Sequence, residues 1–120
     1  MTLRVLKWVT EQLLVSKKVA MATVMSTSGS VPGKSGARLG LTTDSIIGTI
    51  GGAGLEVKVI QRLREMLSEA TTATGEVQTY GLNRGAKGYE VIPLDSLCGG
   101  RVTLALEVII AMPHILFMGG

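Results

Sequence analysis

The segment from Gly48 to Glu56, with the sequence GTIGGAGLE, has the composition of a phosphate-binding turn. An apolar strand end passes through a glycine cluster into a helix, and the glycines of the cluster are Gly51, Gly52 and Gly54. Free N–H groups at the start of a helix, together with the helix dipole, favour a bound anion. Two simpler roles stay open. The glycines can serve only the turn itself, and Glu56 can serve only to complement the dipole.

A second candidate is the loop from Ser28 to Arg38, with the sequence SGSVPGKSGAR. It offers the hydroxyl of Ser30, several main-chain N–H groups, and two cations, Lys34 and Arg38. This combination suits an anionic ligand. A solvated hairpin loop without a ligand is the alternative interpretation.

The only cysteine, Cys98, is followed by Gly99 and Gly100. Backbone N–H groups beside a thiol stabilise the thiolate and make it reactive, whereas a lone cysteine can equally be a small buried apolar residue. One cysteine cannot form an internal disulfide, which agrees with a reducing compartment. His114 is the only histidine, so the sequence offers no histidine pair for a metal or for catalysis, and we predict no catalytic residues.

Charge and composition argue against several classes of function. The 120 residues carry a net charge of +3, from 12 basic and 9 acidic residues that are scattered along the chain. With 3% aromatic residues as well, neither a basic stripe nor a stacking platform for nucleic acid is predicted. The apolar tract at 108–118 is shorter than the roughly 20 residues of a membrane span, and the N-terminus does not resemble an export signal. We therefore expect a cytoplasmic protein.

Hydrophobic periodicity predicts the elements that position these candidates. A first amphipathic helix is predicted over 3–14, with an apolar face made of Leu3, Leu6, Val9 and Leu13. A largely buried strand is predicted over 19–26. Two short strands follow at 37–43 and 46–50, with a tight turn at Asp44 and Ser45.

The second half of the chain continues this alternation of elements. After the glycine cluster, apolar residues recur at helical spacing and predict a second amphipathic helix. These residues are Leu55, Val59, Leu63 and either Met66 or Leu67. Strands are predicted at 77–82, 89–92 and 101–110. The order of helix, three strands, helix and three strands predicts an α+β fold with a mixed β-sheet and two main amphipathic helices packed on it. A further short apolar strand is predicted at 115–118, before two terminal glycines.

Three motifs in order carry a resemblance to a known family: STSGSVPGKSGARL at 26–39, GTIGGAGLE at 48–56 and LCGGRV at 97–102. Together they resemble the N-terminal domain of the xanthine dehydrogenase accessory proteins, the XdhC and CoxI type. In that family a Rossmann-type domain follows, and ILFMGG at 115–120 resembles its first strand. The resemblance therefore divides the chain into an N-terminal domain, residues 1–112, and the start of a missing domain, residues 113–120.

The resemblance implies a maturation factor for molybdenum hydroxylases rather than an enzyme. Members of the family hold the molybdenum cofactor, a pterin-dithiolene with a phosphate, while a terminal sulfido ligand is supplied. The phosphate would bind at the glycine cluster or at the first loop. Glu56 would accept hydrogen bonds from the pterin. The Cys98 thiolate would bind molybdenum or the transferred sulfur. The implied cofactor-binding residues are Ser30, Lys34, Arg38, Gly51, Gly52, Gly54, Glu56, Cys98, Gly99 and Gly100.

The expected partners are the molybdenum hydroxylase apo-enzyme, of the xanthine dehydrogenase or carbon monoxide dehydrogenase type, and a cysteine desulfurase. The alternative is a non-catalytic module that dimerises and recruits one of these proteins. The apolar segment 115–118 also predicts a homodimer, because unpaired strand edges favour pairing with a second chain.

Overall fold

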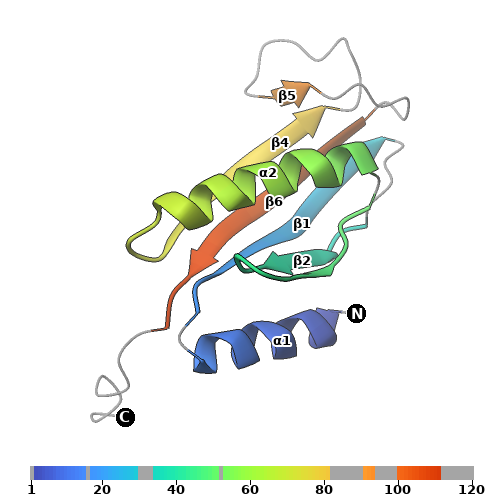
Figure 1. Ribbon diagram of the computed structural model, residues 1–120. Helices are drawn as coiled ribbons and strands as arrows, with labels where there is room; N and C mark the ends of the chain where they lie inside the picture. Colours follow the sequence, from blue (N-terminus) through green and yellow to red (C-terminus); the bar gives the residue numbers. More distant parts are fainter. Residues whose placement is uncertain are drawn as a thin grey trace, which may run out of the picture.

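The computed structural model describes residues 2–15, 17–29, 34–51, 53–81, 91–93 and 100–111. Within these ranges the chain forms two helices and a six-stranded sheet (Figure 1). The elements in chain order are α1 (Thr2–Leu14), β1 (Val19–Gly29), β2 (Arg38–Leu41), β3 (Ile46–Gly48), α2 (Ala53–Glu69), β4 (Thr74–Gly81), β5 (Val91–Pro93) and β6 (Gly100–Ile109). The order of helices and strands agrees with the sequence-based prediction. The predicted strand at 115–118 lies outside the described residues.

The sheet has the strand order β3-β2-β1-β6-β4-β5. β4 and β5 pair in parallel, and the remaining neighbours pair antiparallel, which confirms the predicted mixed sheet and α+β class. β1 and β6 form the long central pair, which begins at Val19 opposite Ile109 and ends at Gly29 opposite Gly100. A bulge between Val24 and Ser26 shifts the register of this pair.

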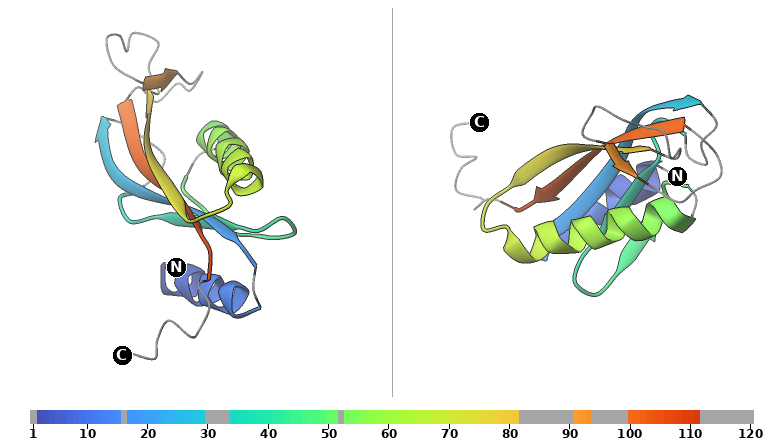
Figure 2. Two further views of the ribbon diagram at one scale, coloured as in Figure 1. Left: turned by 90° about the vertical axis from the view of Figure 1, so that its left-hand side faces the viewer. Right: turned by 90° about the horizontal axis from the view of Figure 1, so that it is seen from above.

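One face of the sheet is covered by α2 (Figures 1 and 2). Alternate residues of β1, β2 and β6 point toward this helix, because side chains alternate between the two faces of a strand. They meet the apolar stripe of α2 in the main core, which contains Ala20, Ala22, Val24, Leu39, Leu41, Ile50, Leu55, Val59, Leu63, Met66, Leu67, Tyr80, Val102, Leu104, Leu106 and Val108. The predicted apolar residues of the second helix are all buried here.

The other face of β1 carries a smaller core with α1. Val19 and Met21 are buried against Val5 and Val9, with Trp8 and Leu13 packed around them. The predicted face of this helix is confirmed for Val9 and Leu13. It was wrong for Leu3 and Leu6, which are 79% and 38% exposed. Two overlapping apolar stripes run along α1, and the contact with β1 selects the one that contains Val5 and Trp8.

Beyond α1, neither of the two described helices covers the second face over β4 and β6 (Figures 1 and 2). Thr79 and Thr103 are paired across these strands, and their hydroxyl groups are 3.1 Å apart. Val77 on β4 points away from α2 and is 68% exposed. In the part of the chain that the structure describes, no helix is long and apolar enough to cross a membrane.

Candidate functional site

One end of the sheet gathers described residues of all three sequence motifs. α2 begins at the end where β1 finishes and β6 starts (Figures 1 and 2). At this end Gly29 is opposite Gly100, and Arg101 lies between Ser28 and Gly81 in the register of β1, β6 and β4. The glycine cluster and Gly100 are therefore at the same end of the molecule, as a shared binding site requires.

The start of α2 is fixed by a short chain of hydrogen bonds. The Thr49 hydroxyl donates to Glu56 Oε2 over 2.7 Å. The Gly51 N–H donates to the same hydroxyl over 3.3 Å, and the Thr49 N–H donates to the Arg38 carbonyl over 3.1 Å. Glu56 therefore joins the strand end to the first turn of α2 and also lies near the positive end of the helix dipole.

Two glycines of the GTIGGAGLE motif have different surroundings. Gly48 has a φ of 81°, and a side chain there would collide with the Arg38 carbonyl, so the chain itself requires glycine at this position. Gly54 is exposed, and a Cβ built on it would meet nothing within 4 Å among the described atoms. No acceptor from the described residues reaches the N–H groups of Gly54 and Leu55. The start of α2 therefore has open space and spare donors for an anion.

The structure describes both predicted cations of the first loop and places the side chain of one, Arg38, on a face of the sheet. Lys34 is exposed. Arg38 begins β2, whose residues Leu39 and Leu41 face α2, so by alternation the Arg38 side chain lies on the opposite face of the sheet. Its Nε atom is buried and has no hydrogen-bond partner among the described residues.

Four predicted site residues lie outside the described residues: Ser30, Gly52, Cys98 and Gly99. Their roles stay predictions, including that of Cys98 as a ligand for molybdenum or sulfur. Among the residues that the structure does describe, no group of three or more histidine, cysteine, aspartate or glutamate side chains is placed to hold a metal ion.

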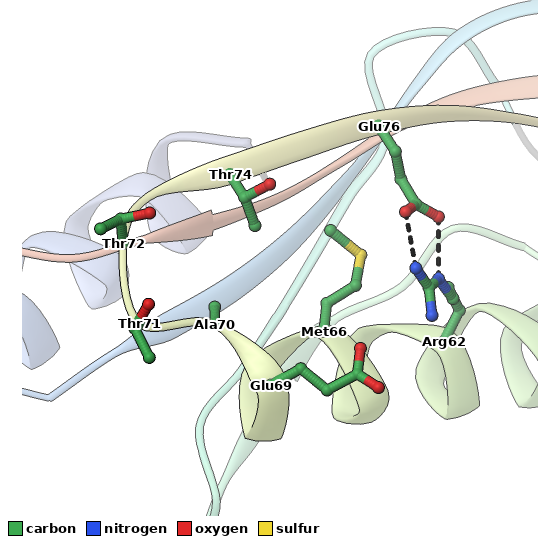
Figure 3. Close-up of a pocket in the computed structure, with 8 residues that line it drawn as sticks. All are labelled: Arg62, Met66, Glu69, Ala70, Thr71, Thr72, Thr74 and Glu76. Carbon is green, nitrogen blue, oxygen red and sulfur yellow. Dashed lines mark hydrogen bonds and ion pairs between the residues drawn. The ribbon is translucent and has the colours of Figure 1, made fainter.

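A cluster of polar side chains joins α2 to β4, and we call it the polar seam. It consists of Arg62, Glu65, Glu76 and Gln78. It was not predicted from the sequence. Arg62 on α2 donates two hydrogen bonds to Glu76 on β4, from Nε over 2.8 Å and from Nη2 over 2.7 Å (Figure 3). Its Nη1 donates to Glu65 over 2.9 Å, and the Gln78 amide donates to Glu76. The side chains of Arg62 and Glu76 are 33% and 25% exposed, so this is a partly buried bidentate pair.

The seam also changes the acidity of two side chains. The hydrogen bonds from Arg62 lower the pKa of Glu76 below its ordinary value and outweigh the opposing effect of burial. Burial raises the pKa of Tyr80, which lies on the same helix-facing side of β4 as Glu76, to about 12. At neutral pH Glu76 is therefore ionised and Tyr80 keeps its proton.

Described residues line two hollows along the seam. The larger has a volume of about 310 Å³ and is bounded by Arg62, Met66, the turn at 69–72, Thr74 and Glu76 (Figure 3). The smaller, which we call the α2–β4 cavity, has a volume of about 210 Å³ and is lined by Lys58, Gln61, Arg62, Glu65 and Tyr80. It lies nearer to the start of α2.

A weak signal for the seam was present in the sequence. Glu76, Gln78 and Tyr80 alternate with Gly75, Val77 and Thr79, so one face of the strand is polar and the other is mixed. The polar face of a strand normally points to solvent. Here it points to the helix, and only the positions of Lys58, Gln61 and Arg62 on α2 explain why.

A family comparison matches the segment that contains the glycine cluster. The model of the XdhC and CoxI family matches residues 15–81, which is more than half of the chain. The chain belongs to the XdhC and CoxI family. The matched region of this family member runs from the end of α1 to the end of β4, so it includes the start of α2 and the polar seam.

A solved structure shares the fold. It is described as a xanthine dehydrogenase from Bacillus halodurans, with 20% sequence identity and a TM-score of 0.64 over 88% of this chain. The present chain spans 29% of the length of that protein. No curated protein sequence matches the chain.

Proposed function

We propose that this XdhC and CoxI family member binds the molybdenum cofactor as cargo, holds it during sulfuration, and passes it to the apo-enzyme of a molybdenum hydroxylase. The target would be of the xanthine dehydrogenase or carbon monoxide dehydrogenase type, and a cysteine desulfurase would supply the sulfur. The observation that carries the proposal is the family match over residues 15–81. In this proposal the chain itself would catalyse no reaction.

The start of α2 suits the phosphate of this cargo. Gly54 leaves open space beside the N–H groups of Gly54 and Leu55, for which no described residue provides an acceptor. These donors and the positive end of the helix dipole are the features that bind phosphate in other proteins. In this proposal Gly51, Gly54 and Gly100 allow close approach of the ligand, and Glu56 orients the pterin. When bound, the cofactor would supply the molybdenum centre that the target enzyme uses.

Loading purified protein with the cofactor and measuring bound molybdenum tests the proposal. We expect near-stoichiometric molybdenum in the loaded protein, and protein that takes up no molybdenum would contradict it. Gly54→Ala separates the effect on cofactor binding from an effect on stability. Its new methyl group lies within 4 Å of no described atom, and alanine favours the helix by about 0.5–1 kcal/mol. The variant should be at least as stable as the wild type and should bind the cofactor more weakly.

A second candidate function is an interaction module that recruits the target enzyme or the desulfurase. The observation that favours it is the outer face of α1, where Leu3 and Leu14 are each 79% exposed and Val15 just beyond the helix is 63% exposed. Exposed apolar side chains on one helix commonly mark a protein contact. Sedimentation of the wild type and a Leu3→Lys, Leu14→Lys double variant decides whether this face forms a homodimer.

A further inference from the structure

The uncovered part of the sheet lies beside α1, on the face opposite α2. Met21 on β1 packs under α1, and it pairs with Glu107 on β6. Paired residues on neighbouring strands point to the same face of a sheet. Beyond Glu107, neither described helix covers this face (Figures 1 and 2). We call it the β4–β6 face, and it consists of Gly75, Val77, Thr79, Thr103, Ala105 and Glu107.

Exposed apolar side chains are concentrated on this side of the described molecule. Eight large apolar side chains are exposed among the described residues, and five of them belong to the α1 segment or to the β4–β6 face: Leu3, Leu6, Leu14, Val15 and Val77. The other side chains of the β4–β6 face, apart from Glu107, are short. The face is therefore low enough for a helix to lie on it and contact Val77.

The outer face of α1 and the β4–β6 face can cover each other in a pair of identical chains. A helix and a sheet commonly bury their apolar faces against one another. In a two-fold dimer every contact occurs twice, so the helix of each copy lies on the sheet of the other. Because the two surfaces lie side by side on one face of the sheet, a single two-fold axis between them covers both.

The two surfaces also carry opposite charges. Lys7 is exposed on α1, one turn after Leu3, and Glu107 is exposed on β6. In the part of the chain that the structure describes, no ion pair joins either of these charged side chains to another residue. Each surface therefore offers one charge that the other can neutralise.

The spacing of these residues allows the apolar and the charged contacts to form together. Leu3 and Lys7 are four residues apart, which is about 6 Å along a helix. Val77 pairs with Ala105 and is the diagonal neighbour of Glu107, and such neighbours lie about 7–8 Å apart. α1 and β6 run in the same general direction (Figure 1), and a two-fold axis along the strands preserves that direction.

We infer that the chain forms a two-fold homodimer in which the outer face of α1 packs on the β4–β6 face of a second copy. Leu3 contacts Val77 of the partner subunit, and Lys7 pairs with Glu107 of the partner subunit. The inference rests on the second candidate function and names the partner of α1 as a second copy. In this dimer α2 lies on the outside of both subunits, so the start of α2 remains accessible to a ligand.

Sedimentation of the full chain over a range of concentrations tests the inference. Val77→Lys places a charge at the centre of the β4–β6 face, so we expect the dissociation constant of the dimer to rise at least about tenfold. Val57→Lys is the matched control, because Val57 is 64% exposed and Val77 is 68% exposed, but Val57 lies on α2. The control should dimerise like the wild type.

A charge exchange tests the contact between Lys7 and Glu107. Lys7→Glu and Glu107→Lys each bring like charges together across the interface, and each should weaken the dimer about tenfold. The double variant restores opposite charges and should dimerise like the wild type, which a misfolded protein would not do. A wild type that stays monomeric would overturn the inference. A dimer that neither Val77→Lys nor the two charge reversals weaken would also overturn it.

The failure of this inference can be distinguished from the failure of the proposed functions. A dimer that is lost in the Leu3→Lys, Leu14→Lys double variant but kept in Val77→Lys would overturn the inference and leave α1 as an interaction surface. Molybdenum loading measures cofactor binding separately. Because the start of α2 lies on the other face of the sheet, we expect Val77→Lys to load molybdenum like the wild type.

Discussion

The two ends of α2 differ in how their backbone groups are used. At the C-terminal end, the Lys18 ammonium donates to the Leu67 and Ala70 carbonyls over 3.0 and 2.9 Å. At the N-terminal end, Glu56 is occupied with Thr49, and no described residue provides an acceptor for the N–H groups of Gly54 and Leu55. Both ends carry the charge that complements the helix dipole. The N-terminal end keeps N–H donors that no described residue uses, so an anionic ligand is expected there.

The side-chain contacts that join α2 to the rest of the fold also differ between the two halves of the helix. Toward its C-terminal half, the helix is joined to β4 by the bidentate Arg62–Glu76 pair. At its start, the described side-chain link is one hydrogen bond between Thr49 and Glu56. The comparison suggests that stability depends on one half of the helix and ligand binding on the other, as separable properties.

The largest expected effect comes from breaking the seam. Arg62→Met should lower the free energy of unfolding by about 2–3 kcal/mol, because Glu76 loses a charge-assisted bidentate partner in a partly buried position. Glu65→Gln is the control, since Glu65 is 52% exposed and an exposed ion pair contributes about 0.5 kcal/mol or less. Urea denaturation measures both variants. Equal losses would show that the seam adds no more than a surface ion pair.

Removing the ammonium group at the other end of α2 should have the next largest effect. Lys18→Met keeps the apolar stem but leaves the Leu67 carbonyl of α2 and the Ala70 carbonyl just beyond it without this donor. We expect a loss of about 1–2 kcal/mol. The neighbouring residue provides a matched control. Lys17 meets Asp44 at 3.4 Å, with both side chains well exposed, so Lys17→Met should change stability by less than about 0.5 kcal/mol. Thermal unfolding of the two variants gives the comparison directly.

Acid should weaken the seam by a smaller amount. The folded-state pKa of Glu76 is below its ordinary value of 4.5, so the carboxylate adds stability above pH 4.5. This contribution is lost as the pH falls through the lowered pKa of the folded state. Stability measured from pH 6 downward should therefore decline less steeply for Glu76→Gln than for the wild type. Parallel curves would show that Glu76 does not contribute to the acid sensitivity.

The smallest expected effect on stability is at the start of α2. Glu56→Gln keeps an oxygen that accepts from Thr49 and removes only the charge near the helix dipole, so stability should fall by less than about 1 kcal/mol. The same variant should weaken cofactor binding, measured as molybdenum retained after loading. A large loss of stability with full retention of the cofactor would make Glu56 a purely structural group and would remove the contrast between the two ends.

The regular elements were predictable because their signals are local. The periodicity of Leu55, Val59 and Leu63 identified α2, and all three residues are buried as predicted. Boundaries were less accurate, since β1 continues to Gly29 and β4 begins at Thr74. In both cases the additional residues pair with β6, and the sequence of one strand contains no information about the length of its partner.

The sequence alone determined the α+β class, the order of the elements and the glycine-containing start of α2, because these depend on the spacing of residues along the chain. Only the tertiary structure decided which stripe of α1 is buried, on which face of the sheet Arg38 lies, and that Glu76 and Tyr80 point toward a helix. These outcomes depend on contacts between residues distant in sequence, such as Arg62 with Glu76 and Trp8 with β2. Packing and the pairing of buried polar groups select among arrangements that local patterns permit equally.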